Sequence, residues 1–132
     1  MFETIVDKRT QGETTLDQCR LAQIYMLDIL DEICKKYNIT YWLSSGTLLG
    51  AIRHDGFIPW DDDIDVGMPK PDYNKFLKIA PRVLPKNIIL QTPEAYPGAF
   101  EAFAKLRDRS SFYCECETRV RIPCGIFIDI FP

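Results

Sequence analysis

The residues of this 132-residue chain that are best suited to chemistry are the carboxylates of one short acidic stretch. Asp61, Asp62, Asp63 and Asp65 fall within five positions, and apolar residues follow the last two. Successive side chains of a β-strand point to opposite faces, so we expect Asp63 and Asp65 on one face. Adjacent carboxylates repel each other, and a divalent cation such as Mg²⁺ relieves that repulsion. The stretch therefore predicts a metal site.

A turn of small residues lies upstream of the acidic stretch. Ser45, Gly46 and Thr47 lead into an apolar segment, Leu48–His54, that we expect to be a short helix. Backbone N–H groups at the start of a helix attract anions. We therefore expect this turn to hold a phosphate group next to the metal.

A third carboxylate stands alone in the last apolar stretch, Gly125–Pro132. This stretch is apolar on both faces, which is typical of a strand in the middle of a sheet. Asp129 within it needs a cation or a hydrogen-bond donor as a partner, because burying an unpaired carboxylate costs free energy. A metal shared with Asp63 and Asp65 would be such a partner, and a hydrogen bond to a helix terminus is the alternative.

Three cationic residues are candidates for binding substrate phosphates. Arg53 ends the short helix, and its guanidinium suits phosphate geometry, with a surface salt bridge to the nearby aspartates as the alternative. Lys105 and Arg107 have the same parity in an expected strand, Phe103–Arg107, so they share a face. For these two residues a solvated face is the alternative to phosphate binding. His54, the single histidine of the chain, is assigned no role.

The rest of the chain supplies the elements that must position these residues. Residues 1–14 are polar and unpatterned, so we expect a loose arm, with residues 15–132 forming one domain. Apolar residues at helical spacing predict an amphipathic helix that Thr15 caps and that stops at Asn38. We expect a second helix from Pro71 to Pro81, strands at Ile39–Ser44, Ile64–Met68 and Asn87–Gln91, and a hairpin of Phe103–Arg107 with Ser111–Cys114.

Composition narrows the class of protein. A hydrophobic content of 46% suits a globular domain, and a net charge of -3 argues against binding nucleic acid. No apolar run reaches the length of a membrane span, so we expect a cytoplasmic protein. The odd number of cysteines without CxxC spacing predicts reduced thiols, although a zinc site formed by the last three remains an alternative. The cysteines are Cys19, Cys34, Cys114, Cys116 and Cys124.

Three motifs together resemble the LicD family. They are SGTLLGAIRH at residues 45–54, GFIPWDDDID at residues 56–65 and FIDIFP at residues 127–132. This family includes bacterial phosphorylcholine transferases and the fukutin-related ribitol-phosphate transferases. The resemblance covers the chain from Leu16 to its end.

The resemblance implies an α+β, nucleotidyltransferase-like fold, in which helices flank a small mixed β-sheet. It implies that Asp63, Asp65 and Asp129 are catalytic residues and ligands of Mg²⁺ or Mn²⁺, with Gly46 and Thr47 at the phosphate. It also implies a phosphotransferase that moves phosphocholine, or a related phospho-alcohol, from a donor such as CDP-choline. The acceptor would be a sugar hydroxyl of a cell-surface glycan, either lipopolysaccharide or teichoic acid.

Two other functions and one structural expectation accompany this hypothesis. A glycosyltransferase that uses a nucleotide sugar also carries a D-x-D metal pair, but it would need a nucleotide-binding α/β unit before that pair. A non-catalytic metal or nucleotide-binding module is the second alternative, and tight Ca²⁺ binding without nucleotide would favour it.

Family members continue well past the Asp-Ile-Phe-Pro motif. We therefore expect an N-terminal piece that lacks the acceptor-binding half, is inactive alone and associates with itself.

Overall fold

The computed structural model describes residues 1–59, 61–95, 102–111 and 125–132. The helical elements are η1 (Arg9–Gln11), α1 (Thr15–Lys36), α2 (Ser45–His54) and α3 (Lys70–Val83). The strands are β1 (Trp42–Leu43), β2 (Asp65–Gly67), β3 (Ile88–Gln91), β4 (Ala104–Asp108) and β5 (Phe127–Phe131). The structure is thus a small α+β fold, which confirms the predicted fold class.

The strands form one mixed sheet in the order β1-β2-β5-β4-β3. β2 and β5 are parallel, and the other neighbouring pairs are antiparallel. β5 lies in the middle of the sheet, as its two apolar faces predicted. The two motifs that carry Asp65 and Asp129 are therefore adjacent strands, although almost half of the chain separates them in sequence.

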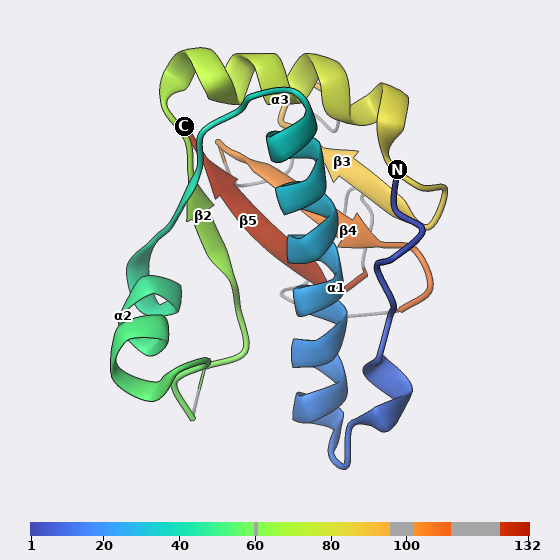
Figure 1. Cartoon of the computed structure of the whole chain (residues 1–132), viewed down its shortest axis with the longest axis vertical. Coiled ribbons are helices and arrows are strands. Elements are labelled where there is room, and N and C mark those ends of the chain that lie inside the picture. Colours follow the sequence, from blue (N-terminus) through green and yellow to red (C-terminus); the bar gives the residue numbers. More distant parts are fainter. Residues whose placement is uncertain (60, 96–101, 112–124) are drawn as a thin grey trace.

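Two helices supply most of the core. Figure 1 shows α1 running in front of the sheet and α3 crossing its upper end, while α2 stands apart beside β2. The apolar stripes of α1 and α3 meet alternate residues of the strands in one cluster. Its fully buried members include Met26, Ile29, Ile33, Phe76, Val66, Leu106, Ile128 and Ile130.

Two helix ends differ from the prediction. α1 is capped by Thr14 rather than Thr15, and the Thr14 side chain accepts a hydrogen bond from the Asp17 N–H. α3 continues through Pro81 to Val83. A proline in the last turn removes only one helical hydrogen bond, so it does not stop the helix at once.

The predicted hairpin of β4 with Ser111–Cys114 is wrong. β4 pairs with β3 along one edge and with β5 along the other. A strand has only two edges, so no edge of β4 remains for Ser111–Cys114. Most of that segment lies outside the described residues.

The arm that precedes α1 contacts the domain. Met1, Phe2 and Ile5 pack against the core cluster. The Arg9 guanidinium donates hydrogen bonds of 2.7 Å and 3.0 Å to the two carboxylate oxygens of Asp108, at the end of β4. The arm is thereby tied to the end of β4, while the boundary of the domain at residue 15 stays a prediction.

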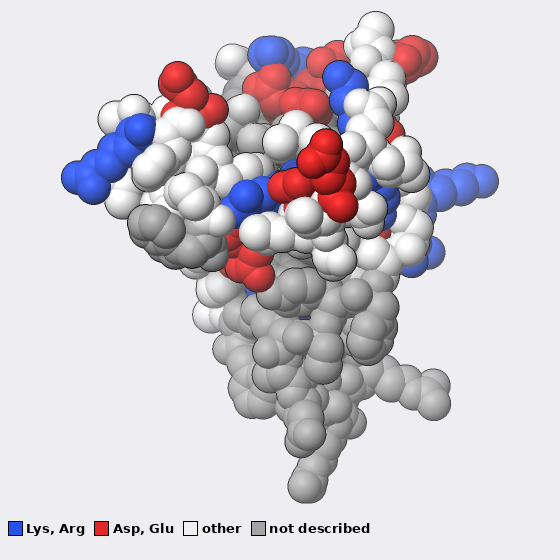
Figure 2. Space-filling view, turned by 90° about the horizontal axis from the view of Figure 1, so that it is seen from below, with Lys and Arg blue, Asp and Glu red and all other residues white. Residues whose placement is uncertain are grey.

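The described surface carries mixed charge. On the face seen in Figure 2, Lys and Arg side chains lie among Asp and Glu side chains rather than in a patch of one sign. Among the described residues, none of the helices has both the length and the apolar character that crossing a membrane requires.

Two cysteines are described, and both are buried free thiols. Burial raises the pKa of Cys34 to about 12 and also raises the pKa of Cys19. A thiol with a raised pKa is a poor nucleophile at neutral pH, so these residues serve packing. Cys114, Cys116 and Cys124, with the zinc alternative, lie outside the described residues.

Candidate active site

A row of four polar side chains crosses four adjacent strands. Asp65 of β2 is in register with Asp129 of β5, Asp129 with Lys105 of β4, and Lys105 with Gln91 of β3. Residues in register on neighbouring strands project to the same side of a sheet. The residues that alternate with them join the core under α1 and α3. The row therefore lies on the side of the sheet that these helices leave open.

Asp129 has a partner within the protein. Lys105 Nζ lies 2.7 Å from Asp129 Oδ1, and the Lys105 side chain is only 1% exposed. The same ammonium lies 3.8 Å from the centre of the Phe127 ring. The compensation for this buried carboxylate is thus a lysine, which neither the metal hypothesis nor the helix-terminus alternative included. The solvated-face alternative for Lys105 is also wrong.

The carboxylates of Asp63, Asp65 and Asp129 influence one another. Burial, the charges of Asp63 and Asp129 and a hydrogen bond with Asp129 raise the pKa of Asp65 to about 7, although Lys105 opposes this. Burial and the charges of three other aspartates raise the pKa of Asp63. The three side chains therefore share more negative charge than Lys105 offsets.

The start of α2 is bonded to the start of β2. Thr47 Oγ1 accepts a hydrogen bond of 2.8 Å from the Asp65 N–H, and the Ser44 N–H donates one of 2.9 Å to the Asp65 carbonyl. Gly46 leaves room for an acidic side chain, since a Cβ at that position would lie 2.7 Å from Asp61 Oδ2. The structure thus brings the small-residue turn and the acidic stretch together.

The two ends of α2 have different surroundings. α2 begins at Ser45, three residues before the predicted start, and Ser45 has a φ of 52°, in the left-handed region that few residues other than glycine adopt. Arg53 is exposed in the last turn, about 12 Å farther along the helix axis by the rise per residue. The structure therefore does not bring Arg53 to the turn. His54 is exposed at the same distant end.

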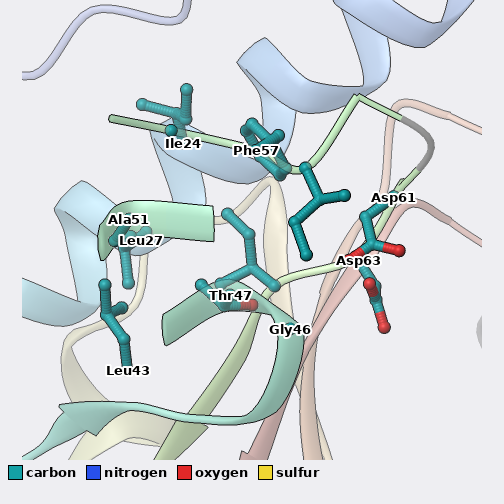
Figure 3. Close-up of a pocket in the computed structure, with 12 residues that line it drawn as sticks. Ile24, Leu27, Leu43, Gly46, Thr47, Ala51, Phe57, Asp61 and Asp63 are labelled. Atoms are coloured by element: carbon teal, nitrogen blue, oxygen red, sulfur yellow. The ribbon is translucent and has the colours of Figure 1, made fainter. Parts of the chain in front are cut away.

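A pocket of about 170 Å³ opens between α1, α2 and the loop before β2. In Figure 3, Asp61 and Asp63 lie next to each other at one end of this pocket, beside Gly46 and Thr47. The other end is apolar and is lined by Leu27, Leu43 and Ala51. The acidic side chains and the turn therefore border one shared space.

Arg107 is buried rather than solvated. Its side chain donates hydrogen bonds of 2.7 Å to Gln91 Oε1 and 2.8 Å to the Gly125 carbonyl, and its guanidinium lies 4.7 Å from the centre of the Phe127 ring. Only 2% of the residue is exposed. These contacts tie β4 to β3 and to the chain that enters β5, which is a structural use of the residue.

Two residues of α1 that were not predicted as site residues contact the acidic stretch. Arg20 donates hydrogen bonds to the backbone carbonyls of Ile58, Pro59 and Asp61, and the Gln23 amide donates one of 2.6 Å to the Asp62 carbonyl. One signal was available. Gln23 falls at helical spacing between Cys19 and Met26, on the apolar face of α1, where a polar residue needs a partner.

The acidic residues suit a divalent cation in their donor chemistry. Carboxylate oxygens are the ligands that Mg²⁺ prefers, and the raised pKa values of Asp63 and Asp65 indicate unbalanced negative charge. Within the described part of the chain, however, no three His, Cys, Asp or Glu side chains are grouped so that they could hold a metal ion. Instead, Asp65 is hydrogen-bonded to Asp129, and Asp129 is paired with Lys105.

Comparison with known proteins places this arrangement among transferases. The family model described as LicD/FKTN/FKRP, nucleotidyltransferase domain, matches residues 38–104, which is about half of the chain. The chain is 35% identical over 121 residues to the lipopolysaccharide cholinephosphotransferase LicD of Haemophilus influenzae. It is 57% identical over 64 residues to the human ribitol 5-phosphate transferase FKRP and 36% identical over 104 residues to the mouse ribitol-5-phosphate transferase FKTN.

These matches cover unequal shares of the proteins compared. The LicD match takes in 89% of this chain and 43% of the relative, the FKRP match 48% and 12%, and the FKTN match 79% and 20%. The chain thus spans less than half the length of each of these relatives. The matched part includes the turn, the acidic stretch and β2.

Proposed function

Because the chain belongs to the LicD family, we propose that it carries the donor site of a phosphotransferase that acts on a glycan. The donor is a CDP-linked alcohol, with CDP-choline as the first candidate. The acceptor is a sugar hydroxyl of a cell-surface glycan such as lipopolysaccharide or teichoic acid. The cofactor is Mg²⁺ or Mn²⁺.

One observation carries this proposal. Asp65 and Asp129 stand in register on adjacent parallel strands, and the first residue of β2 is bonded to the turn at the start of α2. A pair of carboxylates beside backbone N–H groups at a helix start offers opposite charges to a metal and to a phosphate. This combination suits a nucleoside diphosphate better than a simple apolar ligand.

Each residue has a defined task in this proposal. Asp63, Asp65 and Asp129 would have to turn toward one another to hold the cation, which when bound would offset charge on the reacting phosphorus and the leaving CMP. The N–H groups of Ser45, Gly46 and Thr47 receive the pyrophosphate. Thr47 can donate its hydroxyl proton, because its oxygen is the acceptor in its bond with the Asp65 N–H. Asp61 must leave the space next to Gly46 for this to happen.

The acceptor hydroxyl loses its proton to a carboxylate, and we assign that role to Asp129. Lys105 fixes one oxygen of Asp129, so it orients this base instead of binding the substrate directly. Arg107 and Arg53 are left out of the donor site, because one is bonded within the sheet and the other is at the far end of α2.

The test is a transfer assay on the full-length protein with labelled CDP-choline, a glycan acceptor and Mg²⁺. Asp63→Asn and Asp65→Asn should each reduce transfer and CMP release by at least roughly 10²-fold while leaving circular dichroism unchanged, since each removes a charge needed in the transition state. Asp55→Asn, at the exposed C-cap of α2, is the matched control and should keep full activity. Normal turnover by either active-site variant would exclude that residue from the site.

A panel of donors separates this function from its alternatives. CDP-ribitol and CDP-glycerol test the identity of the alcohol, and UDP-glucose tests the glycosyltransferase hypothesis. Transfer from UDP-glucose alone, or tight Ca²⁺ binding without any transfer, would overturn the proposal. We also propose a cytoplasmic location and self-association, the latter supported by the exposed Leu48, Leu49 and Ile52 of α2.

A further inference from the structure

Arg20 of α1 forms hydrogen bonds with the loop that leads into the acidic stretch. Its Nε lies 3.0 Å from the Asp61 carbonyl, and one terminal nitrogen lies 3.0, 2.9 and 2.6 Å from the carbonyls of Ile58, Pro59 and Asp61. The guanidinium also lies 5.0 Å from the centre of the Phe57 ring. Among the described residues, no carboxylate lies at salt-bridge distance from Arg20, so it engages the backbone of the loop and not its charges.

Gln23, one helical turn along, holds the next part of the same loop. Its Nε2 donates to the Asp62 carbonyl at 2.6 Å and to the Phe127 carbonyl at 3.3 Å. The second contact joins the loop to β5, two residues before Asp129. Its Oε1 is buried without a hydrogen-bond partner, a cost that packing alone would not require. Both side chains of α1 therefore hold the backbone of this loop through its carbonyl groups.

The path of this backbone decides where two carboxylates point. Asp61 approaches Gly46, and both Asp61 and Asp63 border the pocket beside the turn. Among its described residues, the loop has a turn-type backbone bond of its own from the Asp61 N–H to the Ile58 carbonyl. A guanidinium can satisfy several carbonyls at once because its donors are fixed in a planar fork, which an ammonium cannot reproduce.

We propose that Arg20 is a positioning residue that sets the direction of Asp63 by fixing the loop carbonyls that it binds, with Gln23 as its second anchor. This inference rests on the proposed phosphotransferase function. Arg20 touches neither donor nor acceptor. Its loss should leave the Asp63 carboxylate chemically intact but free to turn away from Asp65 and Asp129.

The experiment compares Arg20→Lys with Arg82→Lys, an exposed arginine of α3. Arg20→Lys should lower kcat by roughly 10²-fold, the effect of displacing a reacting group by about 1 Å, with KM for the donor changed far less. Arg20→Ala should regain part of its kcat when free guanidinium is added. Gln23→Met, which keeps volume and removes the orphaned oxygen, should lower kcat in the same manner without lowering Tm.

A second readout does not depend on transfer. Amide hydrogen exchange in Arg20→Lys should rise in residues 58–63 and stay unchanged in β4 and β5. If the full-length wild-type protein fails to transfer, the proposed function fails while this exchange measurement still tests Arg20. Unchanged kcat per folded molecule, or exchange raised equally throughout the domain, would overturn the positioning role. So would failure of both Arg20→Lys and Gln23→Met to fold, because the contact would then be a general requirement for folding.

Discussion

Lys105 changes the character of the acidic site by itself. Asp65 and Asp129 are adjacent carboxylates on neighbouring strands, and the Lys105 ammonium is paired with Asp129. The pKa of Asp65 is raised by burial first and then by the charges of Asp63 and Asp129, and the charge of Lys105 opposes the rise. One neighbouring ammonium therefore distinguishes the surroundings of the two aspartates.

Asp65 should make the stability of the protein depend on pH in a specific direction. Its pKa is raised from 3.8 to about 7 in the folded state. Between these values the folded state binds more protons than the unfolded state, so the free energy of unfolding should fall as the pH rises through this window. Asp65→Asn removes this titration, and its unfolding free energy should change less over the same window.

Urea unfolding without divalent ions, at several pH values across the window, measures this difference. Asp55→Asn serves as the control and should keep the wild-type slope. Identical slopes for wild type and Asp65→Asn would mean that the repulsion around Asp65 is absent in solution.

The end of β4 and the chain that enters β5 approach each other closely. Gly125 precedes β5, and a Cβ there would collide with the backbone carbonyl of Asp108 at the end of β4. The Asp108 N–H donates a bond of 2.7 Å to the Ile126 carbonyl, which holds the two backbones together at this point. The glycine is thus a requirement for close approach, and its neighbour in space is backbone that cannot turn aside.

Gly125→Ala should therefore destabilise the domain by about 1–3 kcal/mol, the usual cost of overpacking a filled site. Gly56→Ala is the matched control, because a Cβ at Gly56 meets no atom within 4 Å. This control should stay within about 0.5 kcal/mol of wild type, as most surface substitutions do. Chemical unfolding of the two variants gives the comparison, and equal stability would show that the β4–β5 junction relaxes.

The N-terminal arm extends across the domain to the end of the sheet. Arg9 and Asp108 are 99 residues apart in sequence, and the Asp108 side chain is completely buried. Burial acts to raise the pKa of Asp108, but hydrogen bonds from Arg9, Ser111 and Ser110 and the charge of Arg9 outweigh it, so its pKa lies below the ordinary value. The ion pair between Arg9 and Asp108 thus attaches the arm to the domain.

Arg9→Ala should lower the free energy of unfolding by about 3 kcal/mol at neutral pH, because it leaves a buried carboxylate without its partner. A lowered pKa stabilises the fold above the ordinary pKa of the carboxyl group, and this contribution disappears as the pH falls through the folded-state value. The difference between Arg9→Ala and wild type should therefore shrink in acid. Arg82→Ala, on an exposed part of α3, should match wild type at every pH. A constant difference at all pH values would assign the effect of Arg9 to packing alone.

The sequence by itself determined the local features of this protein. Residue alternation predicted a strand beginning near Asp65, and β2 begins at that residue, although Asp63 lies in the loop before it. Helical spacing predicted the core faces of α1 and α3. The doubly apolar stretch around Asp129 predicted the central strand β5. Each of these depends on a period that a few neighbouring residues set, and such periods can be read without knowing any partner. The resemblance to the LicD family likewise came from three short motifs, each made of neighbouring residues.

Only the tertiary structure decided which groups meet. Lys105 reaches Asp129 because β4 pairs with β5, and that pairing also removed the edge needed by the predicted hairpin. Arg20 meets carbonyls about 40 residues away, and Arg9 meets Asp108 across almost the whole chain. No local period encodes such contacts, since they depend on strand order and on where a helix crosses the sheet. The sequence thus determined which carboxylates could form a site, and the long-range packing decided their counter-ion, their direction and their neighbours.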